Sequence, residues 1–267
     1  MSTNATICAP LPFTITDVGN EAPVGPATNL ANDKLGRVWK TAGSSDRYVI
    51  VDLGAATVIN TVALLATNAA SDDTFRVRGA NTVPALSGAI PGPLVFDQTR
   101  NLPASPEGLR RLHRQGLLLL AGSVSVRYVR IDITSAASDF SAGRLVIGNH
   151  MAAEDNVDYG WEMGVADLGR TESMPLGVDD DEIAAKVLAF SWKWSWLTEA
   201  EARGQMLDLL AYAGITRPVL MVMNPEAADL HNVIAYGKIS EGAPMRNYAT
   251  DLYDVSFKMR SMLVLNL

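Results

Sequence analysis

The chain contains a single cysteine, Cys8, among its 267 residues. That scarcity excludes an internal disulfide framework and a zinc site built on cysteine thiolates, and it favours a reducing compartment. Long apolar runs are also missing, since the longest, residues 116–122, is far shorter than the roughly 20 residues that span a bilayer. The first residues lack a basic segment followed by an apolar one, the pattern of a secretory signal. We therefore expect no targeting segment and no insertion into a membrane.

Catalytic motifs are equally scarce. The three histidines, His113, His150 and His231, do not have metal-ligand spacing, and the sequence contains no nucleophile elbow, phosphate-binding glycine loop or dinucleotide fingerprint. The adjacent acids at 179–181 would repel one another, which indicates a solvated loop. We therefore expect no catalytic residue, no cofactor and no resident metal. A glycan hydrolase stays as a third hypothesis, because the separation of two catalytic carboxylates is spatial and leaves no sequence motif.

Charge and composition divide the chain near residue 150. Residues 1–150 carry 13 Lys and Arg and 11 Asp and Glu, a net charge of +2, whereas residues 151–267 carry 9 and 18, a net charge of −9. Four of the five tryptophans and nine of the ten methionines also fall after residue 150. This contrast predicts two domains. The one basic cluster, within residues 110–114, is too small to neutralise many phosphates, so nucleic acid is not an expected partner.

The first half predicts a mainly β fold. After a proline-rich N-terminal arm over residues 1–27, short runs of alternating apolar and polar residues are separated by turn residues and show no helical period. Such strands bury one face and expose the other, and several in succession predict an antiparallel β-sandwich over residues 28–150. The expected strands are residues 48–53, 58–66, 74–78, 128–133 and 145–147.

The same region resembles the galactose-binding-like, or discoidin-type, jelly roll. The resemblance lies in the order of five segments along the chain: Leu30 with Asp33-Lys34, Trp39-Lys40-Thr41, residues 48–54 with their Asp-Leu-Gly end, residues 59–64, and residues 127–131 with their Arg-Tyr-Val-Arg start. In that family these segments belong to core strands, so the resemblance implies a fold more than a ligand. It implies that Trp39 packs in the core or at a sheet edge, with stacking on a sugar as the alternative.

Members of that family hold ligands in loops at one end of the sandwich, which here implies residues 43–46, 68–73 and 138–141. These loops are short and consist mainly of Ser, Ala, Asn and Asp, so we expect weak or absent glycan affinity and docking of the jelly roll on other proteins. Asp72 and Asp73 could ligate calcium through hard oxygens, but a solvated turn is the simpler interpretation. The candidate loop contacts are Ser45, Asn68, Asp72, Asp73, Asp139 and Phe140, the last being the nearest match to a sugar-stacking aromatic.

The second half, residues 151–267, predicts a compact α+β unit of antiparallel sheet with one helix. Residues 188–196 alternate strictly and place Trp192, Trp194 and Trp196 on one face, which we expect to be core or subunit interface, with a glycan platform as the alternative. Thr198 and Glu201 form a capping box before a helix over residues 199–213, and Gly214 ends that helix. Strands are expected at 218–223, 233–239 and 253–259, residues 158–170 should join the same sheet, and 178–182 should form an acidic loop.

The order of strand, helix and three strands resembles the sheet-with-one-helix unit of tailed-phage tail tubes and of distal tail proteins. In those proteins such units pair edge to edge into rings, and a jelly roll joined to such a unit is found in tail-tip and baseplate proteins. The resemblance implies a structural protein of the virion tail, assembled in the bacterial cytoplasm as a homo-oligomeric ring, threefold or sixfold, that contacts other tail proteins. The alternative is a carbohydrate-binding module, or a receptor-binding protein that recognises a host surface glycan.

Overall fold

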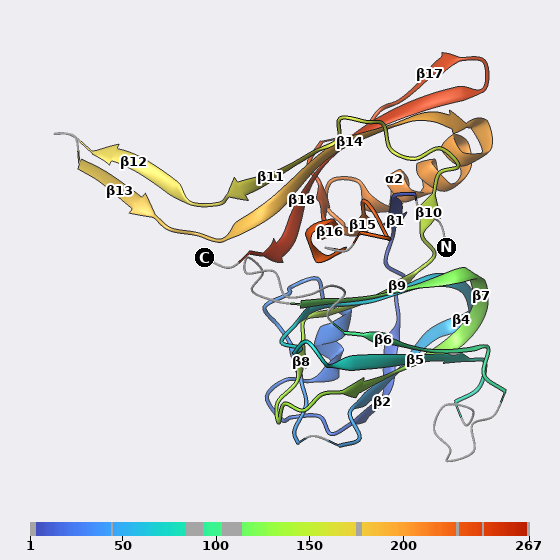
Figure 1. Cartoon of the computed structure of the whole chain (residues 1–267), viewed down its shortest axis with the longest axis vertical. Helices are drawn as coiled ribbons and strands as arrows, with labels where there is room; N and C mark the ends of the chain where they lie inside the picture. Colours follow the sequence, from blue (N-terminus) through green and yellow to red (C-terminus); the bar gives the residue numbers. More distant parts are fainter. Residues whose placement is uncertain are drawn as a thin grey trace.

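The computed structural model describes residues 4–43, 45–83, 93–102, 114–174, 178–227, 230–241 and 243–265. Antiparallel strands dominate these residues, and they form two units, a β-sandwich and a sheet accompanied by a helical segment (Figure 1). The predicted fold class, a sandwich joined to an α+β unit, is confirmed. Within the described part of the chain, no helix has the length and apolar character needed to cross a bilayer.

Two long antiparallel strands, β4 (Tyr48–Thr67) and β7 (Arg114–Thr134), form the centre of the sandwich. β4 joins the two predicted strands 48–53 and 58–66, because the residues between them stay extended through bulges and do not turn. β7 contains the predicted strand 128–133 and also the apolar run 116–122, for which no strand is predicted. The main sheet has the order β2-β4-β7-β5-β6 with β9 on β4, and β3 pairs with β8. The remaining bounds are β2 (Thr14–Gly19), β3 (Trp39–Lys40), β5 (Thr74–Ala80), β6 (Phe96–Asn101), β8 (Ser141–Ala142) and β9 (Arg144–Gly148).

Irregular pairing midway along both long strands divides each into two halves. The register of the β4–β7 ladder shifts between Asp52 and Thr57, where Gly54 has a φ of +83° that favours glycine. Side chains from both halves lie in one hydrophobic core, for example Val51 before the shift and Val62 after it. Both halves of β4, before and after the shift, therefore contribute side chains to the one sandwich core.

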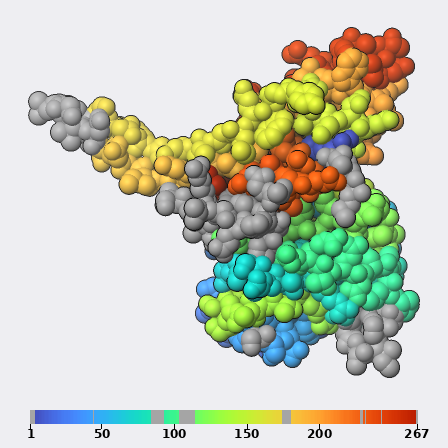
Figure 2. All heavy atoms as spheres, in the orientation of Figure 1, coloured from blue at the N-terminus to red at the C-terminus, as the bar shows by residue number. Residues whose placement is uncertain are grey.

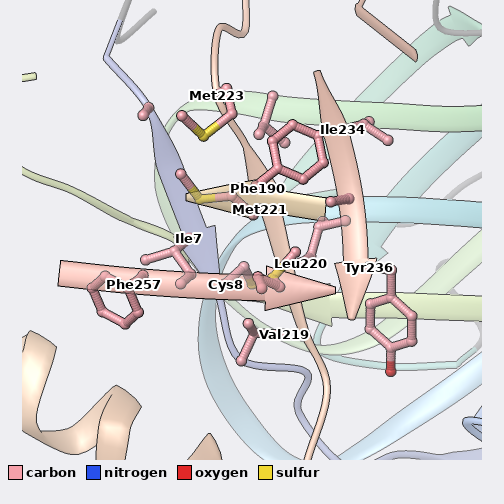
Figure 3. Close-up of a cluster of buried hydrophobic side chains, with 14 of the residues drawn as sticks. Ile7, Cys8, Phe190, Val219, Leu220, Met221, Met223, Ile234, Tyr236 and Phe257 are labelled. Carbon is pink, nitrogen blue, oxygen red and sulfur yellow. The ribbon is translucent and has the colours of Figure 1, made fainter. Parts of the chain in front are cut away.

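The second unit is a sheet that has eight strands within the described ranges. Its order is β10-β1-β15-β16-β18-β14-β11, with β17 paired to β18. Figure 3 shows part of its core, where aliphatic and aromatic side chains from several of these strands meet. The bounds are β10 (Met151–Ala152), β11 (Glu162–Asp167), β14 (Lys186–Thr198), β15 (Val219–Val222), β16 (Ile234–Ile239), β17 (Met245–Ala249) and β18 (Leu252–Val264), with a short 3₁₀ turn η3 (Leu230–Asn232) before β16.

Residues 6–8 form a strand of this second sheet, whereas the sequence predicts an N-terminal arm over residues 1–27. Strand β1 (Thr6–Cys8) pairs with β10 on one side and with β15 on the other. Ile7 and Cys8 are each 1% exposed and lie among the side chains of β15 and β16 (Figure 3). The chain then enters the sandwich through β2 and the 3₁₀ turn η1 (Ala27–Ala31). Both partners of β1 lie far along the chain, so the local sequence pattern does not reveal this pairing.

The two units share a hydrophobic interface. Successive residues of β4 point to opposite sides, so that Leu64 belongs to the core of the sandwich and Leu65 to the core of the second unit. On β7, Leu118 and Leu117 divide in the same way. Strands that are buried on both faces read as continuous apolar runs, which explains the run at residues 116–122.

A polar cluster around the buried Arg144 also joins the units. Arg144 of β9 is 6% exposed, donates to the Leu30 carbonyl (2.8 Å) and the Tyr236 hydroxyl (3.2 Å), and forms an ion pair with Asp33 (3.1 Å). The Tyr236 hydroxyl in turn donates to the Asp33 carboxylate at 2.6 Å. Burial raises the pKa of Tyr236 above its usual range, so the phenol stays protonated and keeps donating. Breaking such a cluster would leave a buried charge without its partner.

The helical segment begins and ends as predicted. The Thr198 N–H donates to the Glu201 carboxylate (2.9 Å), and the Glu201 N–H donates to Thr198 Oγ1 (3.3 Å), which completes the capping box. The segment starts with a π-helical stretch η2 (Glu201–Met206) and continues as α2 (Leu207–Ala213). Gly214 ends it with a φ of +49°, and its N–H donates to the Leu210 carbonyl at 2.9 Å.

A hairpin arm, residues 168–185, continues from β11 and β14 beyond the sheet. It contains β12 (Arg170–Met174) paired with β13 (Val178–Glu182). Figure 1 shows this arm projecting away from the rest of the molecule, and Figure 2 shows it as a thin extension. The prediction of an acidic loop at 178–182 is therefore wrong. Glu182 lies opposite Arg170 and Asp181 opposite Thr171, which reduces repulsion there, whereas Asp180 lies opposite Glu172, a like-charge pair.

Candidate functional site

The three loops implied by the jelly-roll resemblance gather at one end of the sandwich, where Arg47 joins two of them. Arg47 is 2% exposed, its Nε donates to the Gly43 carbonyl (2.7 Å), and its terminal nitrogens donate to the carbonyls of Ser135 (3.2 Å) and Ala137. Asn68 links loop 68–73 to loop 138–141. Its side-chain amide donates to the Asp139 carbonyl and accepts from the Ser141 N–H, both at 2.8 Å. These hydrogen bonds place residues 43 and 68 each beside the segment 135–141.

Most of the predicted polar contacts in these loops already take part in local hydrogen bonds. Asp73 is 3% exposed and its carboxylate accepts from the Ala70 N–H at 2.8 Å, whereas the exposed Asp72 accepts from the Ser71 hydroxyl at 3.2 Å. The Ser45 carbonyl accepts from the Asn20 side chain. Within the described residues, no three His, Cys, Asp or Glu side chains are grouped so as to hold a metal ion. The loops therefore offer exposed Ser45, Asn68, Asp72 and Asp139 side chains without a carboxylate cage.

Phe140 is not an exposed contact residue, which corrects the prediction. Its side chain is 0% exposed and packs edge-on against Trp39, with ring centroids 6.1 Å apart. Trp39 is also 0% exposed, as its expected core role requires. The cause is the pairing of β3 with β8, which places the residue before β8 over the sandwich core. This end of the jelly roll therefore lacks its predicted stacking surface.

Two of the three tryptophans on β14 are core residues, as predicted. Trp192 is 3% exposed and Trp194 is 1% exposed. Trp192 stacks on Phe257 of β18 with centroids 5.1 Å apart, and Trp194 meets the same ring edge-on at 5.7 Å. These contacts bind β14 to β18 and leave neither indole free to form a glycan platform.

Trp196 lies on the other side, against the prediction that all three indoles share one face. A β-bulge between Trp194 and Leu197 gives Trp196 a φ of +64°. Leu197 takes the core position and is 1% exposed, whereas Trp196 is 55% exposed and packs edge-on against Tyr248 (5.5 Å). Asp158 holds the strand just before the bulge, since its carboxylate accepts from the Ser195 hydroxyl (2.6 Å) and N–H (3.3 Å).

The outward turn of Trp196 contributes to a cleft on the α+β unit, which we call the aromatic cleft. Its volume is about 930 Å³. Three of its aromatic side chains are exposed, with relative exposures of 106% for Tyr159, 37% for Trp161 and 55% for Trp196. The remaining lining residues are Asp155, Asn156, Val157, Asp158, Met223, Asn224 and Glu226. No sequence motif announced this cleft, because its residues come from three separate segments.

The second exposed feature is β11, the last strand in the order of the C-terminal sheet. It pairs with β14 on one side, and the sheet order places no described strand on its other side. Apolar side chains remain exposed along β11 and into the arm: Met163 47%, Val165 60%, Leu168 43% and Ile183 85%. An open edge that carries exposed apolar side chains is a template for pairing with another chain.

The buried thiol and the partly buried imidazole near the unit interface have packing roles. Burial raises the pKa of Cys8 to about 12, so its thiol stays protonated and unreactive. His150 Nδ1 lies 2.7 Å from Thr61 Oγ1, and burial lowers the pKa of the imidazole, which favours the neutral ring. Residue 44 and the basic cluster residues 110–113, which include the histidine, lie outside the described residues.

Comparisons with known proteins give structural neighbours only. No protein-family model and no curated protein sequence matches the chain. Among solved structures, the chain is similar to a carbohydrate-binding module, CBM32-1, from a family 31 glycoside hydrolase of Clostridium perfringens, at 11% identity and a TM-score of 0.38, covering 52% of this chain and 96% of that one. It is also similar to a family 32 carbohydrate-binding module of C. perfringens solved with galactose, at 16% identity and a TM-score of 0.39, covering 53% and 98%.

A third neighbour is a fucose-binding module of Streptococcus pneumoniae, at 15% identity and a TM-score of 0.37, covering 52% of this chain and 90% of that one. These three neighbours are carbohydrate-binding modules, and none of them is a virion protein. Each matches only about half of this chain.

Proposed function

We propose that the protein is a structural subunit that assembles with copies of itself through β11 and the hairpin arm. The observation that carries the proposal is the arm, an extended pair of strands with exposed side chains. An isolated two-stranded hairpin is marginally stable in water, because it has no third strand or packed face to bury its apolar residues. A neighbouring subunit would supply that missing surface.

The open edge of β11 supports the same proposal. Its N–H and C=O groups on the unpaired side can add a strand from another chain, and main-chain hydrogen bonds then join the two sheets. Proteins that remain monomeric usually protect such an edge with inward-pointing charges, a proline or a covering loop. Here Met163 and Val165 are exposed on the strand itself, which is the arrangement expected of an interface.

Charge also favours a second copy as the partner. Among the residues whose exposure the structure describes, the exposed acids of β11 and the arm are Glu162, Asp167, Glu172, Asp180, Asp181 and Glu182. Two of them already form ion pairs, Asp167 with Lys186 and Glu172 with Arg170. On the outer face of the sheet, Lys238 of β16 lies directly opposite Arg260 of β18, and both are exposed. Like charges directly opposite each other destabilise a sheet, and a carboxylate near both would offset that repulsion. The acidic arm of a neighbouring subunit would provide such carboxylates.

The proposed setting is the tail tip or baseplate of a bacteriophage, with assembly in the bacterial cytoplasm. In this proposal the α+β unit forms a closed ring, threefold or sixfold, and the jelly roll docks on neighbouring virion proteins. Support for the setting comes from the order of strands and helix in residues 151–267 and from the jelly roll joined to it. Support for docking comes from the loop end, where Phe140 is buried and the described loop residues include no exposed aromatic ring.

The variant Val165→Lys tests this proposal. We expect the wild-type protein to sediment as an oligomer. A lysine on the open edge opposes pairing with another strand, because its charge must be desolvated and its side chain ordered, so the variant should shift toward monomer. Val24→Lys is the matched control, since Val24 is 81% exposed and lies in the sandwich unit, outside β11 and the arm. Sedimentation velocity measures all three proteins. A wild-type monomer, or a Val165→Lys protein that sediments like wild type, would contradict the proposal.

Carbohydrate binding is the second candidate function. The specific observation that favours it is the aromatic cleft, which combines exposed aromatic rings with polar side chains. The jelly-roll loops lack that combination. In the assembled particle such a site would recognise a glycan on the host surface.

A further inference from the structure

We infer that the aromatic cleft of the α+β unit binds a neutral carbohydrate. The inference rests on the second candidate function and moves its site away from the jelly-roll loops. The cleft volume of about 930 Å³ falls within the range of ligand sites in proteins, about 300–1,000 Å³. Such sites combine aromatic walls with a few polar groups that fix the orientation of the ligand, and both are present here.

The aromatic rings supply flat surfaces for a sugar. A pyranose ring presents a face of C–H groups, which packs on an indole or phenol ring and removes apolar area from water. Tyr159 and Trp196 are exposed by more than half, so their faces remain available for such contact. Trp161 is exposed to a lesser degree and stands beside them in the cleft lining.

Trp196 is held in position before any ligand arrives. Its left-handed φ of +64° is unfavourable for a bulky residue and is maintained by Leu197 in the core and by Asp158 on the preceding serine. Tyr248 supports the ring from one side with an edge-on contact. A fixed ring loses little conformational freedom on binding, so more of the contact energy contributes to affinity.

The polar lining determines the class of sugar. Asp155 and Glu226 provide carboxylates that accept charge-assisted hydrogen bonds from sugar hydroxyls, and Asn224 provides an amide. The described lining contains three carboxylates, with Asp158, and no Lys or Arg. A sialic acid or uronic acid would therefore bring a negative charge toward like charges without a cation to pair with it. Neutral hexoses meet no such penalty.

The experiment measures binding of the intact protein to an array of neutral and acidic oligosaccharides, followed by titration calorimetry with the strongest neutral trisaccharide. We expect neutral glycans to bind and their sialylated or uronic counterparts to bind more weakly. Trp196→Ala should lower the affinity about tenfold, and Glu226→Ala should lower it to a similar extent. Ile215→Ala is the control, since Ile215 is 60% exposed and does not line the cleft. Thermal melting confirms that each variant is folded.

The outcomes separate the site from the function. If no oligosaccharide on the array binds, both the carbohydrate function and this site are overturned. If glycans bind with unchanged affinity in Trp196→Ala and Glu226→Ala, carbohydrate binding stands and the aromatic cleft is the wrong site. Stronger binding of acidic than of neutral glycans would overturn the neutral-sugar assignment.

Discussion

Trp194 and Trp196 are two residues apart on one strand yet have opposite environments. A strict alternation would place both indoles in the core, and one inserted residue reverses the alternation from that point on. The bulge at Trp196 does this and moves Leu197 into the core. The sequence pattern predicted Trp192 and Trp194 correctly, because their stretch of the ladder is regular. It could not predict the position of Trp196, because a regular strand would bury Trp196 and a bulged strand buries Leu197, and both residues are apolar.

The two indoles should therefore respond differently to truncation. Trp194→Ala removes a fully buried ring, and we expect it to lower the free energy of unfolding by roughly 3–5 kcal/mol. Trp196→Ala removes a half-exposed ring and should lower it by less than about 1 kcal/mol. Urea denaturation of both variants beside wild type provides the measurement. Equal losses of unfolding free energy would contradict the prediction, because they would mean that the Trp196 indole packs as a core residue.

Elements with local signals were predictable from sequence, whereas elements ordered by distant partners were not. The capping box at Thr198 and Glu201 and the stop at Gly214 depend on neighbours along the chain, and they were predicted correctly. Strand β1 depends on β10 and β15, so its short apolar segment was read as part of an arm. The hairpin of β12 and β13 was missed because acidic residues are poor strand formers in isolation.

The candidate sites also differ in how much of each could be predicted from sequence. The resemblance implied that the jelly-roll loops lie at one end of the sandwich, and hydrogen bonds of Arg47 and Asn68 link them there. Arg47 was missed, since a lone arginine before a strand carries no motif. The aromatic cleft was missed for a different reason: Tyr159, Trp196 and Asn224 come from separate segments, and only the folded sheet brings them together.

The start of the helical segment gives a pH-dependent prediction. Burial alone would raise the pKa of Glu201, but the hydrogen bonds from the Glu154 and Thr198 N–H groups and from the Thr198 hydroxyl outweigh burial and lower it. A lowered folded-state pKa means that the carboxylate stabilises the fold above the pKa of unfolded glutamate and that this stability is lost as the pH falls through the folded value. Glu201→Gln should therefore destabilise at neutral pH and flatten the acid limb of the stability profile.

Thermal melts of wild type and Glu201→Gln across acid to neutral pH check this prediction. Glu199→Gln serves as the matched control, because Glu199 is two residues away and pairs with Arg203 on the helix surface. Thr198→Ala should cost about 1 kcal/mol through loss of the cap. A Glu201→Gln protein with the same pH profile as wild type would show that the capping carboxylate does not stabilise the helix start.

At the scale of the whole molecule, two units that share an interface carry an arm and an open strand edge. Leu65 and Leu117 of the sandwich pack into the core of the second unit, and Arg144 joins the units through Asp33 and Tyr236. This shared interface would fix the direction of the arm relative to the jelly roll. A fixed arm that meets the next copy at a constant angle produces a closed ring if the rotation closes, and a filament if it does not.

Native mass spectrometry of the wild-type protein at micromolar concentration tests the central claim, self-assembly through β11 and the arm, most directly. We expect one dominant species with a mass that is a fixed multiple of the chain, three or six copies for the proposed ring. Val165→Lys should dissociate this species at the same concentration, and Val24→Lys should not. A wild-type spectrum dominated by a single chain would show that the protein does not assemble through β11 and the arm.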